Sequence, residues 1–131
     1  MDKTNGKILR LLAANARMSW QEIGRKVHLS GQAVASRVQH MLDSGELAGF
    51  TTRLGKQERY LVTVFMTSLR FIDFEAFIQN NQHIEEALKT AGEGCYQLTV
   101  NFDIDHELEK FLTSLLTYGT YRVHRIVRQV K

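Results

Sequence analysis

The chain has 131 residues, of which 44% are hydrophobic and 24% charged, so it should fold into one domain or two small ones. No apolar run approaches the ~20 residues that a membrane span needs, and we identify no signal peptide, which excludes a membrane protein and predicts a cytoplasmic one. The single Cys95 cannot form an internal disulfide, in keeping with a reducing compartment.

Positive charge is concentrated in the first part of the chain. Residues 1–55 carry eight Lys or Arg and four acidic residues, whereas residues 56–131 carry nine and ten. A basic part beside a near-neutral one indicates a polyanionic partner such as nucleic acid. The asymmetry is equally compatible with an ordinary solvated surface.

Two short helices are predicted at the start of the chain. The first should begin near Thr4–Asn5 and end near Asn15, with leucine and isoleucine at helical spacing between them. The motif "SWQE" at residues 19–22 has the pattern of a capping box and predicts the start of the second helix at Ser19. Gly24 inside that helix costs roughly 1 kcal/mol relative to alanine, which suggests close packing there.

A third helix should follow after the short turn "HLS". Ser30 is its N-cap candidate and Gly45 its end, with Val34, Val38, Met41 and Leu42 as the buried stripe. Two helices joined by a tight turn form a helix-turn-helix, in which the last helix enters the major groove of DNA.

The outward side of this third helix carries small, uncharged groups suited to a DNA groove. Gln32, Ser36 and His40 fall opposite the buried stripe, with Ala33 and Gln39 beside them. An amide pairs with adenine, a hydroxyl with several bases, and an alanine methyl touches thymine. The positive end of the helix dipole favours phosphate.

The basic residues nearby have two interpretations each. Arg37 could hold a phosphate or pair with an acidic residue of the first two helices. Arg25 and Lys26 could contact the DNA backbone, or could simply complement the dipole of their own helix. The predicted DNA-contacting residues are Arg25, Lys26, Ser30, Gln32, Ala33, Ser36, Arg37, Gln39 and His40.

The rest of the chain alternates strands and helices. We expect an extended arm over 46–54, a strand over 60–69, a helix from Asp73, a strand over 95–102, a helix capped by Asp105 and ended by Gly119, and a strand over 120–130. Segment 84–92 is ambiguous: its apolar spacing favours a helix, whereas "GEG" directly after it suits a hairpin. A strand there would complete a ferredoxin-like βαββαβ domain.

Such a sheet has both helices on one face, so we expect a second copy of the chain to cover the other face in a homodimer.

The quoted motifs resemble the Lrp/AsnC (leucine-responsive, feast/famine) family of transcription regulators. The matching features run from "IL" and "NAR" through "EIG" and "V-H-L-S" to "GELAGF". The resemblance implies an α+β fold with a helix-turn-helix domain at 1–50, an arm or linker at 51–59, and a ferredoxin-like dimerisation and effector domain at 60–131. It also implies that 84–91 is a strand, and that dimers assemble into tetramers or octamers.

Three features depart from the family pattern. Asn5 stands where the family has a second acidic residue, and the linker around "LGKQE" is shorter. The effector hairpin, which in the family reads Gly-x-x-Asp, is here Gly92, Glu93, Gly94 and Cys95. A carboxylate at that place suits the ammonium group of an amino-acid effector, and a neutral thiol cannot replace it. Glu93 could substitute, or could merely be exposed at the hairpin tip.

The leading hypothesis is therefore a sequence-specific regulator that binds double-stranded DNA and responds to an amino acid or related small molecule. An architectural protein that wraps DNA with low sequence specificity is the first alternative. The second is an enzyme resembling the sirohaem decarboxylases that share this domain pair. The five histidines, at 28, 40, 83, 106 and 124, show no metal-ligand spacing. We expect no metal, cofactor or catalytic residue.

Overall fold

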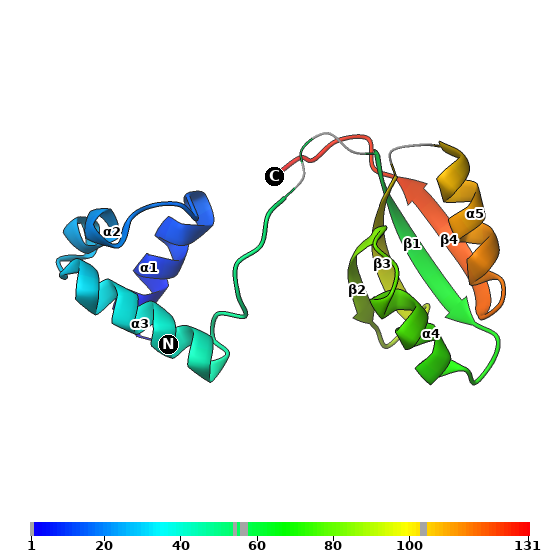
Figure 1. The fold of residues 1–131 in the computed structure, drawn as a ribbon, viewed down its shortest axis with the longest axis horizontal. Helices are drawn as coiled ribbons and strands as arrows, with labels where there is room; N and C mark the ends of the chain where they lie inside the picture. The colour runs from blue at the N-terminus through cyan, green and yellow to red at the C-terminus, as the bar shows by residue number, and fades with distance from the viewer. Residues whose placement is uncertain (1, 54, 56–57, 103–104) are drawn as a thin grey trace. The chain divides into compact units, whose positions relative to one another are not determined.

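The computed structural model describes residues 2–53, 55, 58–102 and 105–131, with only the backbone of 105 and 106. The chain divides into two compact units, Met1–Arg53 and Leu54–Lys131 (Figure 1). The first unit contains three helices, α1 (Lys3–Ala14), α2 (Trp20–Val27) and α3 (Gly31–Ser44). The second contains β1 (Glu58–Met66), α4 (Phe71–Gln79), β2 (Ile84–Lys89), β3 (Tyr96–Phe102), α5 (Asp105–Leu115) and β4 (Gly119–Arg125). This is the predicted α+β fold.

Side-chain caps set the starts of the three helices in the first unit. The Ser19 hydroxyl accepts a hydrogen bond from the Glu22 N–H at 3.1 Å, and the Ser30 hydroxyl accepts one from the Ala33 N–H at 3.1 Å, as predicted. The first helix begins slightly earlier than predicted, because the Asp2 carboxylate accepts from the Asn5 N–H at 2.7 Å. Gly45 ends α3 with a positive φ of 82°, a conformation that glycine adopts without strain.

Aliphatic side chains alone form the core of the first unit. All three helices contribute to it, and its buried members are Ile8, Leu12, Ile23, Val34, Val38 and Met41. Gly24 lies where α2 meets the turn before α3: a Cβ there would collide with the backbone carbonyl oxygen of Leu29. The close packing expected at this glycine is therefore present.

The second unit is a four-stranded antiparallel sheet in the order β2-β3-β1-β4. Figure 1 shows α4 and α5 against the same face of this sheet. Segment 84–89 is a strand, so the choice made for it against its helical spacing is confirmed. Burial alternates along β1 and β3, with Tyr60, Val62 and Val64 and then Tyr96, Leu98, Val100 and Phe102 turned toward the helices.

Several predicted boundaries in the second unit are wrong. Gly119 does not end α5, which stops at Leu115; it is the first residue of β4, where a Cβ would strike the backbone of β1 at Phe65. Helix α4 starts at Phe71 rather than Asp73, and β4 ends at Arg125. Strand β1 already begins at Glu58, inside the predicted 51–59 linker. The side-chain cap predicted at Asp105 lies outside the described side chains.

Aromatic rings fill the core between the sheet and its helices. Phe74 of α4 is fully buried and packs its ring 4.9 Å from both Tyr96 and Tyr118, centroid to centroid. The Tyr96 hydroxyl donates to Glu75 at 2.8 Å. Burial, and after it this hydrogen bond, raises the pKa of Tyr96 to about 12.

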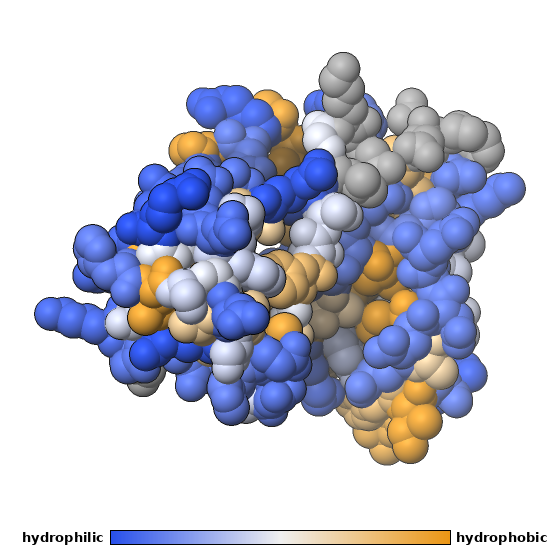
Figure 2. Space-filling view, turned by 60° about the vertical axis from the view of Figure 1, so that its left-hand side comes forward, coloured by the Kyte–Doolittle hydropathy of each residue, from blue (hydrophilic) through white to orange (hydrophobic). Residues whose placement is uncertain are grey.

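Among the described residues of the second unit, no helix covers the other face of the sheet. Leu61 and Leu88 are about half exposed there, and the Arg122 guanidinium lies over the ring of Phe65 at 5.3 Å. The Thr63 hydroxyl donates to the Gln97 side-chain oxygen at 2.7 Å across β1 and β3. In the space-filling view of Figure 2, apolar patches interrupt a largely hydrophilic surface. We call the set Leu61, Thr63, Phe65, Leu88, Gln97 and Arg122 the open sheet face.

Candidate nucleic-acid interface

Helix α3 presents a polar side to solvent and an apolar side to the core. Val34, Val38 and Met41 are buried. Gln32, Ser36 and His40 are exposed and lie opposite them, as the helical periodicity predicts. Within the described part of the chain, these three side chains make no hydrogen bond or ion pair. We call them the reading face.

The N-terminal end of α3 allows close approach of another backbone. Its first turns contain Gly31, Ala33 and Ala35, and only Gln32 among them has a long side chain. Ser30 is exposed and uses its hydroxyl on the Ala33 N–H, which leaves other N–H groups of the first turn for an anion. A small helix end with free donors suits a groove wall lined by phosphates.

Besides Ser30, two of the predicted DNA-contacting residues already have side-chain partners in the unit. The Arg37 guanidinium donates to Asp2 Oδ2 at 2.9 Å and to Asn5 Oδ1 at 3.1 Å. Gln39 donates to Asp43 at 2.9 Å, one turn further along α3. Of the two interpretations given to Arg37, the geometry favours pairing with an acidic residue near the first helix.

Asn5 takes part in the Arg37 contact. Its side-chain oxygen accepts one of the two hydrogen bonds from Arg37, and the Asp2 carboxylate accepts the other. The hydrogen bond from the Asn5 N–H, and after it the Arg37 guanidinium, holds the pKa of Asp2 below its ordinary value. The sequence showed the departure at Asn5 but not its partner.

Arg25 and Lys26 are exposed in the last turn of α2, before His28, whose φ of 62° places it in the left-handed region. Neither has a hydrogen bond or ion pair to another described residue. Both remain available for phosphate. Sequence inspection missed two further cations close to Lys26: Lys7 and Arg10 of α1 line one open pocket with it.

The predicted effector residues form the β2–β3 hairpin. Gly92 and Gly94 have φ of 112° and 82°, so both positions favour glycine. Glu93 is exposed, and Cys95 is half-buried with its N–H donating to the Val64 carbonyl at 2.8 Å. The hairpin is thus held against β1, with one carboxylate at its tip.

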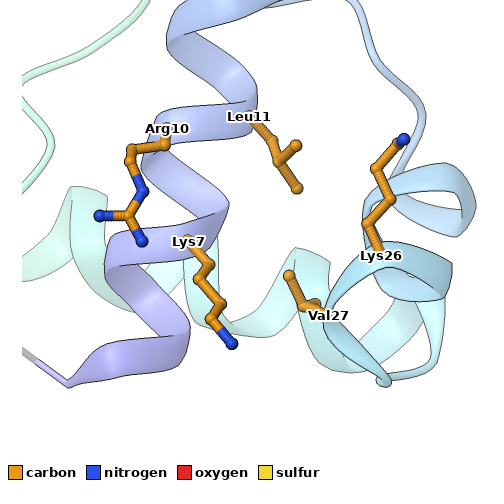
Figure 3. A pocket seen from close by; sticks show the side chains of 5 residues that line it. All are labelled: Lys7, Arg10, Leu11, Lys26 and Val27. Carbon is orange, nitrogen blue, oxygen red and sulfur yellow. The ribbon is translucent and has the colours of Figure 1, made fainter.

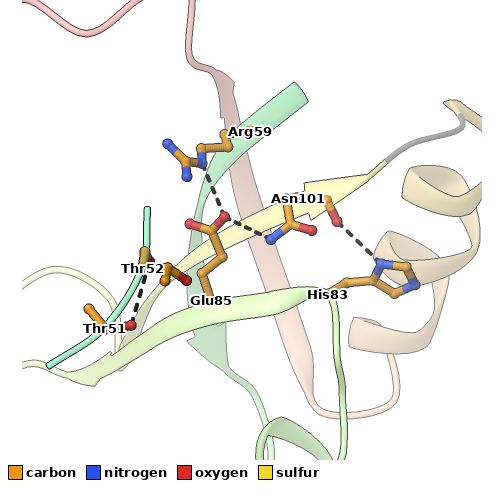
Figure 4. A network of polar contacts seen from close by, with 6 residues as sticks. All are labelled: Thr51, Thr52, Arg59, His83, Glu85 and Asn101. Carbon is orange, nitrogen blue, oxygen red and sulfur yellow. Dashed lines mark hydrogen bonds and ion pairs between the residues drawn. The ribbon is translucent and has the colours of Figure 1, made fainter. Parts of the chain in front are cut away.

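Among the histidines whose side chains the structure describes, His83 makes the most contacts with other residues. His83 is part of a polar network: its Nδ1 lies 3.2 Å from the Asn101 carbonyl oxygen, while the Asn101 amide and the Arg59 guanidinium both donate to Glu85 (Figure 4). His106 lies outside the described side chains. In the described part of the chain, no group of three or more His, Cys, Asp or Glu could hold a metal ion.

Comparison with known proteins identifies the family. Residues 1–42 match the model of the AsnC-type helix-turn-helix domain. The HTH-type transcriptional regulator LrpB of Bacillus subtilis is 34% identical over 136 residues, which cover 100% of this chain and 91% of LrpB. This chain belongs to the Lrp/AsnC family of transcriptional regulators. LrpA of the same organism is 29% identical and covers 97% of this chain and 98% of its own.

Solved structures of Lrp/AsnC proteins share the fold over the whole chain. LrpC of B. subtilis superposes with a TM-score of 0.88 at 24% identity, covering 100% of this chain and 97% of its own. A transcriptional regulator of Neisseria meningitidis, solved in complex with L-Met, gives 0.85 at 22% identity, covering 100% and 92%. No helix within the described ranges is long and apolar enough to cross a membrane. The chain is a DNA-binding regulator of the Lrp/AsnC type.

Proposed function

We propose that this Lrp/AsnC regulator recognises its DNA site through the reading face of α3. The observation that carries the proposal is that Gln32, Ser36 and His40 are exposed, uncommitted and on one side of the helix. Each can donate and accept hydrogen bonds, and none carries a fixed charge that would favour phosphate over bases. Ala33 lies beside them, where its methyl group can touch thymine.

Phosphate contacts would position this face on the duplex. Ser30 and the first turn of α3 offer backbone donors, and Arg25 and Lys26 offer free positive charges. We place Arg37 and Gln39 at the edge of the interface, since their present partners Asp2 and Asp43 compete with DNA. Arg37 then holds α3 against the start of α1 through Asp2 and Asn5, and does not contact phosphate.

A second copy of the chain would cover the open sheet face. Leu61 of the central strand β1 and Leu88 of the edge strand β2 are about half exposed on a sheet whose opposite face packs against α4 and α5. A homodimer would present two α3 helices to half-sites about one helical turn apart. Tetramers or octamers of such dimers are the further assembly expected of the family. A monomer at micromolar concentration in a sedimentation measurement would contradict the dimer.

We propose further that an amino acid or related small molecule modulates DNA binding at the β2–β3 hairpin. The relative from N. meningitidis was solved with L-Met, which makes an amino acid the first class of effector to test. Cys95 offers no carboxylate for the ammonium group, so Glu93, the exposed carboxylate of the hairpin, takes that part. The protein acts in the cytoplasm and has no catalytic role.

The test is fluorescence anisotropy on labelled DNA from just upstream of the protein's own gene, at several salt concentrations, with and without a pool of amino acids. Gln32→Ala and Ser36→Ala should reduce discrimination between that DNA and unrelated DNA by about tenfold each. Lys26→Ala should weaken both DNAs alike, with a salt slope smaller by about 1. Gln79→Ala, an exposed glutamine of α4, is the matched control.

Each outcome is decisive. Site preference that survives both Gln32→Ala and Ser36→Ala would remove the reading face from recognition. Tight binding with no preference between DNAs, and a long footprint, would favour the architectural alternative. No binding at low salt would contradict DNA recognition altogether.

A further inference from the structure

Helices α1 and α2 line an open pocket of about 190 Å³ that shares only Lys26 with the proposed DNA interface. Its lining consists of Lys7, Arg10 and Leu11 from α1 and of Lys26 and Val27 from α2 (Figure 3). In that view α3 passes behind the other two helices. The pocket therefore opens on the side of the unit where α1 and α2 are exposed.

Three cations surround this pocket without an acidic neighbour among its lining residues. Lys7, Arg10 and Lys26 are exposed, and none of them has a hydrogen bond or ion pair to another described residue. Elsewhere in the same unit Arg37 is paired with Asp2. Free cations on one small rim create a local positive potential that attracts an anionic group.

The floor between these cations is apolar. Leu11 and Val27 are half-buried and pack against the aliphatic core of the unit, so their outer surfaces face the pocket. A ligand that fills the pocket must therefore bring an apolar group for the floor together with negative charge for the rim. A DNA backbone brings the charge but has no apolar projection of that kind.

The pocket also lies away from the reading face. The buried side of α3, with Val34 and Val38, packs toward α1 and α2, whereas Gln32 and Ser36 point the opposite way. A duplex held by α3 would leave the outer surface between α1 and α2 open. A partner that pairs with Lys7 and Arg10 could therefore occupy the pocket while Lys26 contacts DNA.

We propose that this pocket docks an acidic segment of a partner protein through one apolar side chain. That side chain lies on Leu11 and Val27, and acidic residues on either side of it pair with Lys7 and Arg10, while Lys26 stays with the DNA backbone. The contact goes beyond DNA recognition and does not depend on it. Through this contact the regulator would recruit a partner protein to the DNA site that α3 binds.

The test uses the full chain and a short fluorescein-labelled peptide of glutamates with one central leucine. Its companion has serine in place of the leucine. We expect the leucine peptide to bind at low salt, and the serine peptide to bind about tenfold more weakly, because a buried leucine side chain contributes more than 1.4 kcal/mol. Lys7→Gln combined with Arg10→Gln should weaken the leucine peptide by about tenfold, since two ion pairs are lost.

A matched double variant removes the same charge elsewhere in the unit. Lys3→Gln with Arg17→Gln changes two exposed cations that do not line the pocket, and peptide binding should hardly change. Equal losses in the two double variants, equal affinity for both peptides, or no binding at all would overturn the proposal. A DNA titration runs alongside: if only the Lys7 and Arg10 double variant lowers the salt slope by about 2 and no peptide binds, the cations serve DNA instead.

Discussion

The cores of the two units contain different kinds of side chain. The core of the first unit contains only aliphatic residues from three helices, whereas the second packs aromatic rings between a sheet and two helices. In the first unit the helix caps are hydrogen bonds between residues three apart, and Arg37 supplies the ion pair across it. In the second, the ordered contacts join strands distant in the sequence, such as Arg59 with Glu85.

This difference determines which surface each unit leaves exposed for binding. Short helices with local caps need little of their surface for folding, so most of α3 outside its buried stripe is free to meet DNA. A four-stranded sheet with helices on one side buries one of its faces and leaves the other exposed, where we propose that a second copy packs. A change in one core should therefore lower the stability of that unit alone. A change at an exposed position should alter DNA binding without altering the free energy of unfolding.

The largest effect is expected from Phe74→Ala in the second unit. Phe74 is fully buried among the rings of Phe77, Tyr96 and Tyr118, so its removal leaves a cavity and should cost about 3–5 kcal/mol in the free energy of unfolding. Amide hydrogen exchange measures this loss unit by unit. Protection should fall across the sheet and stay unchanged in the three-helix unit. An equal loss in both would show that the units fold as one.

In the first unit, we expect Gly24→Ala to lower the free energy of unfolding although it adds only one methyl group. A helix gains roughly 1 kcal/mol when alanine replaces glycine. Here the added methyl collides with the Leu29 backbone, and displacing a backbone costs about 3 kcal/mol, so a net loss of about 2 kcal/mol is expected. Thermal unfolding followed by hydrogen exchange checks it.

Gly6→Ala provides the control for Gly24→Ala, because nothing lies within 4 Å of a Cβ at that position of α1. It should stabilise the unit by up to about 1 kcal/mol. Stabilisation by both changes would contradict the close approach of α2 to the turn.

The sequence predicted the first unit better than the second for a physical reason. Ser19, Ser30 and Gly45 act on neighbours a few residues away, so their roles can be recognised from spacing alone. The strand at 84–89 has helical spacing and is a strand because β3 pairs with it. Gly119 illustrates the same limit, since the feature that requires glycine there is the β1 backbone beside it.

Part of the candidate site could not be predicted from the sequence either. The exposed positions of α3 follow from periodicity, and Gln32, Ser36 and His40 lie where it placed them. The partner of Arg37 depends on how α1 packs against α3, which spacing does not determine. The same holds for Lys7, which comes together with Lys26 only through the packing of α1 on α2.

The two serine caps allow folding and binding to be separated within one unit. Ser19→Ala and Ser30→Ala each remove one capping hydrogen bond and should each cost about 1 kcal/mol in the free energy of unfolding. Only Ser30 begins the helix that carries the reading face. We expect Ser30→Ala to weaken DNA binding by several-fold more than Ser19→Ala in anisotropy titrations, and equal losses would assign both serines to stability alone.

The smallest effect concerns the pH dependence of the first unit. The Asn5 N–H and the Arg37 guanidinium lower the pKa of Asp2, so the folded protein binds its proton less readily than the unfolded chain does. The stability from these contacts is therefore complete above the ordinary aspartate pKa of about 3.9, and is lost as the pH falls through the lower pKa of the folded state. The free energies of unfolding of the wild type and of Asp2→Asn should differ at neutral pH and converge as the pH falls below the lowered pKa of Asp2. Asn5→Asp, which adds the acidic residue usual in the family, should steepen the profile because Arg37 would then hold two carboxylates. A profile that neither substitution alters would show that α1 is held to α3 by its apolar contacts and not by this ion pair.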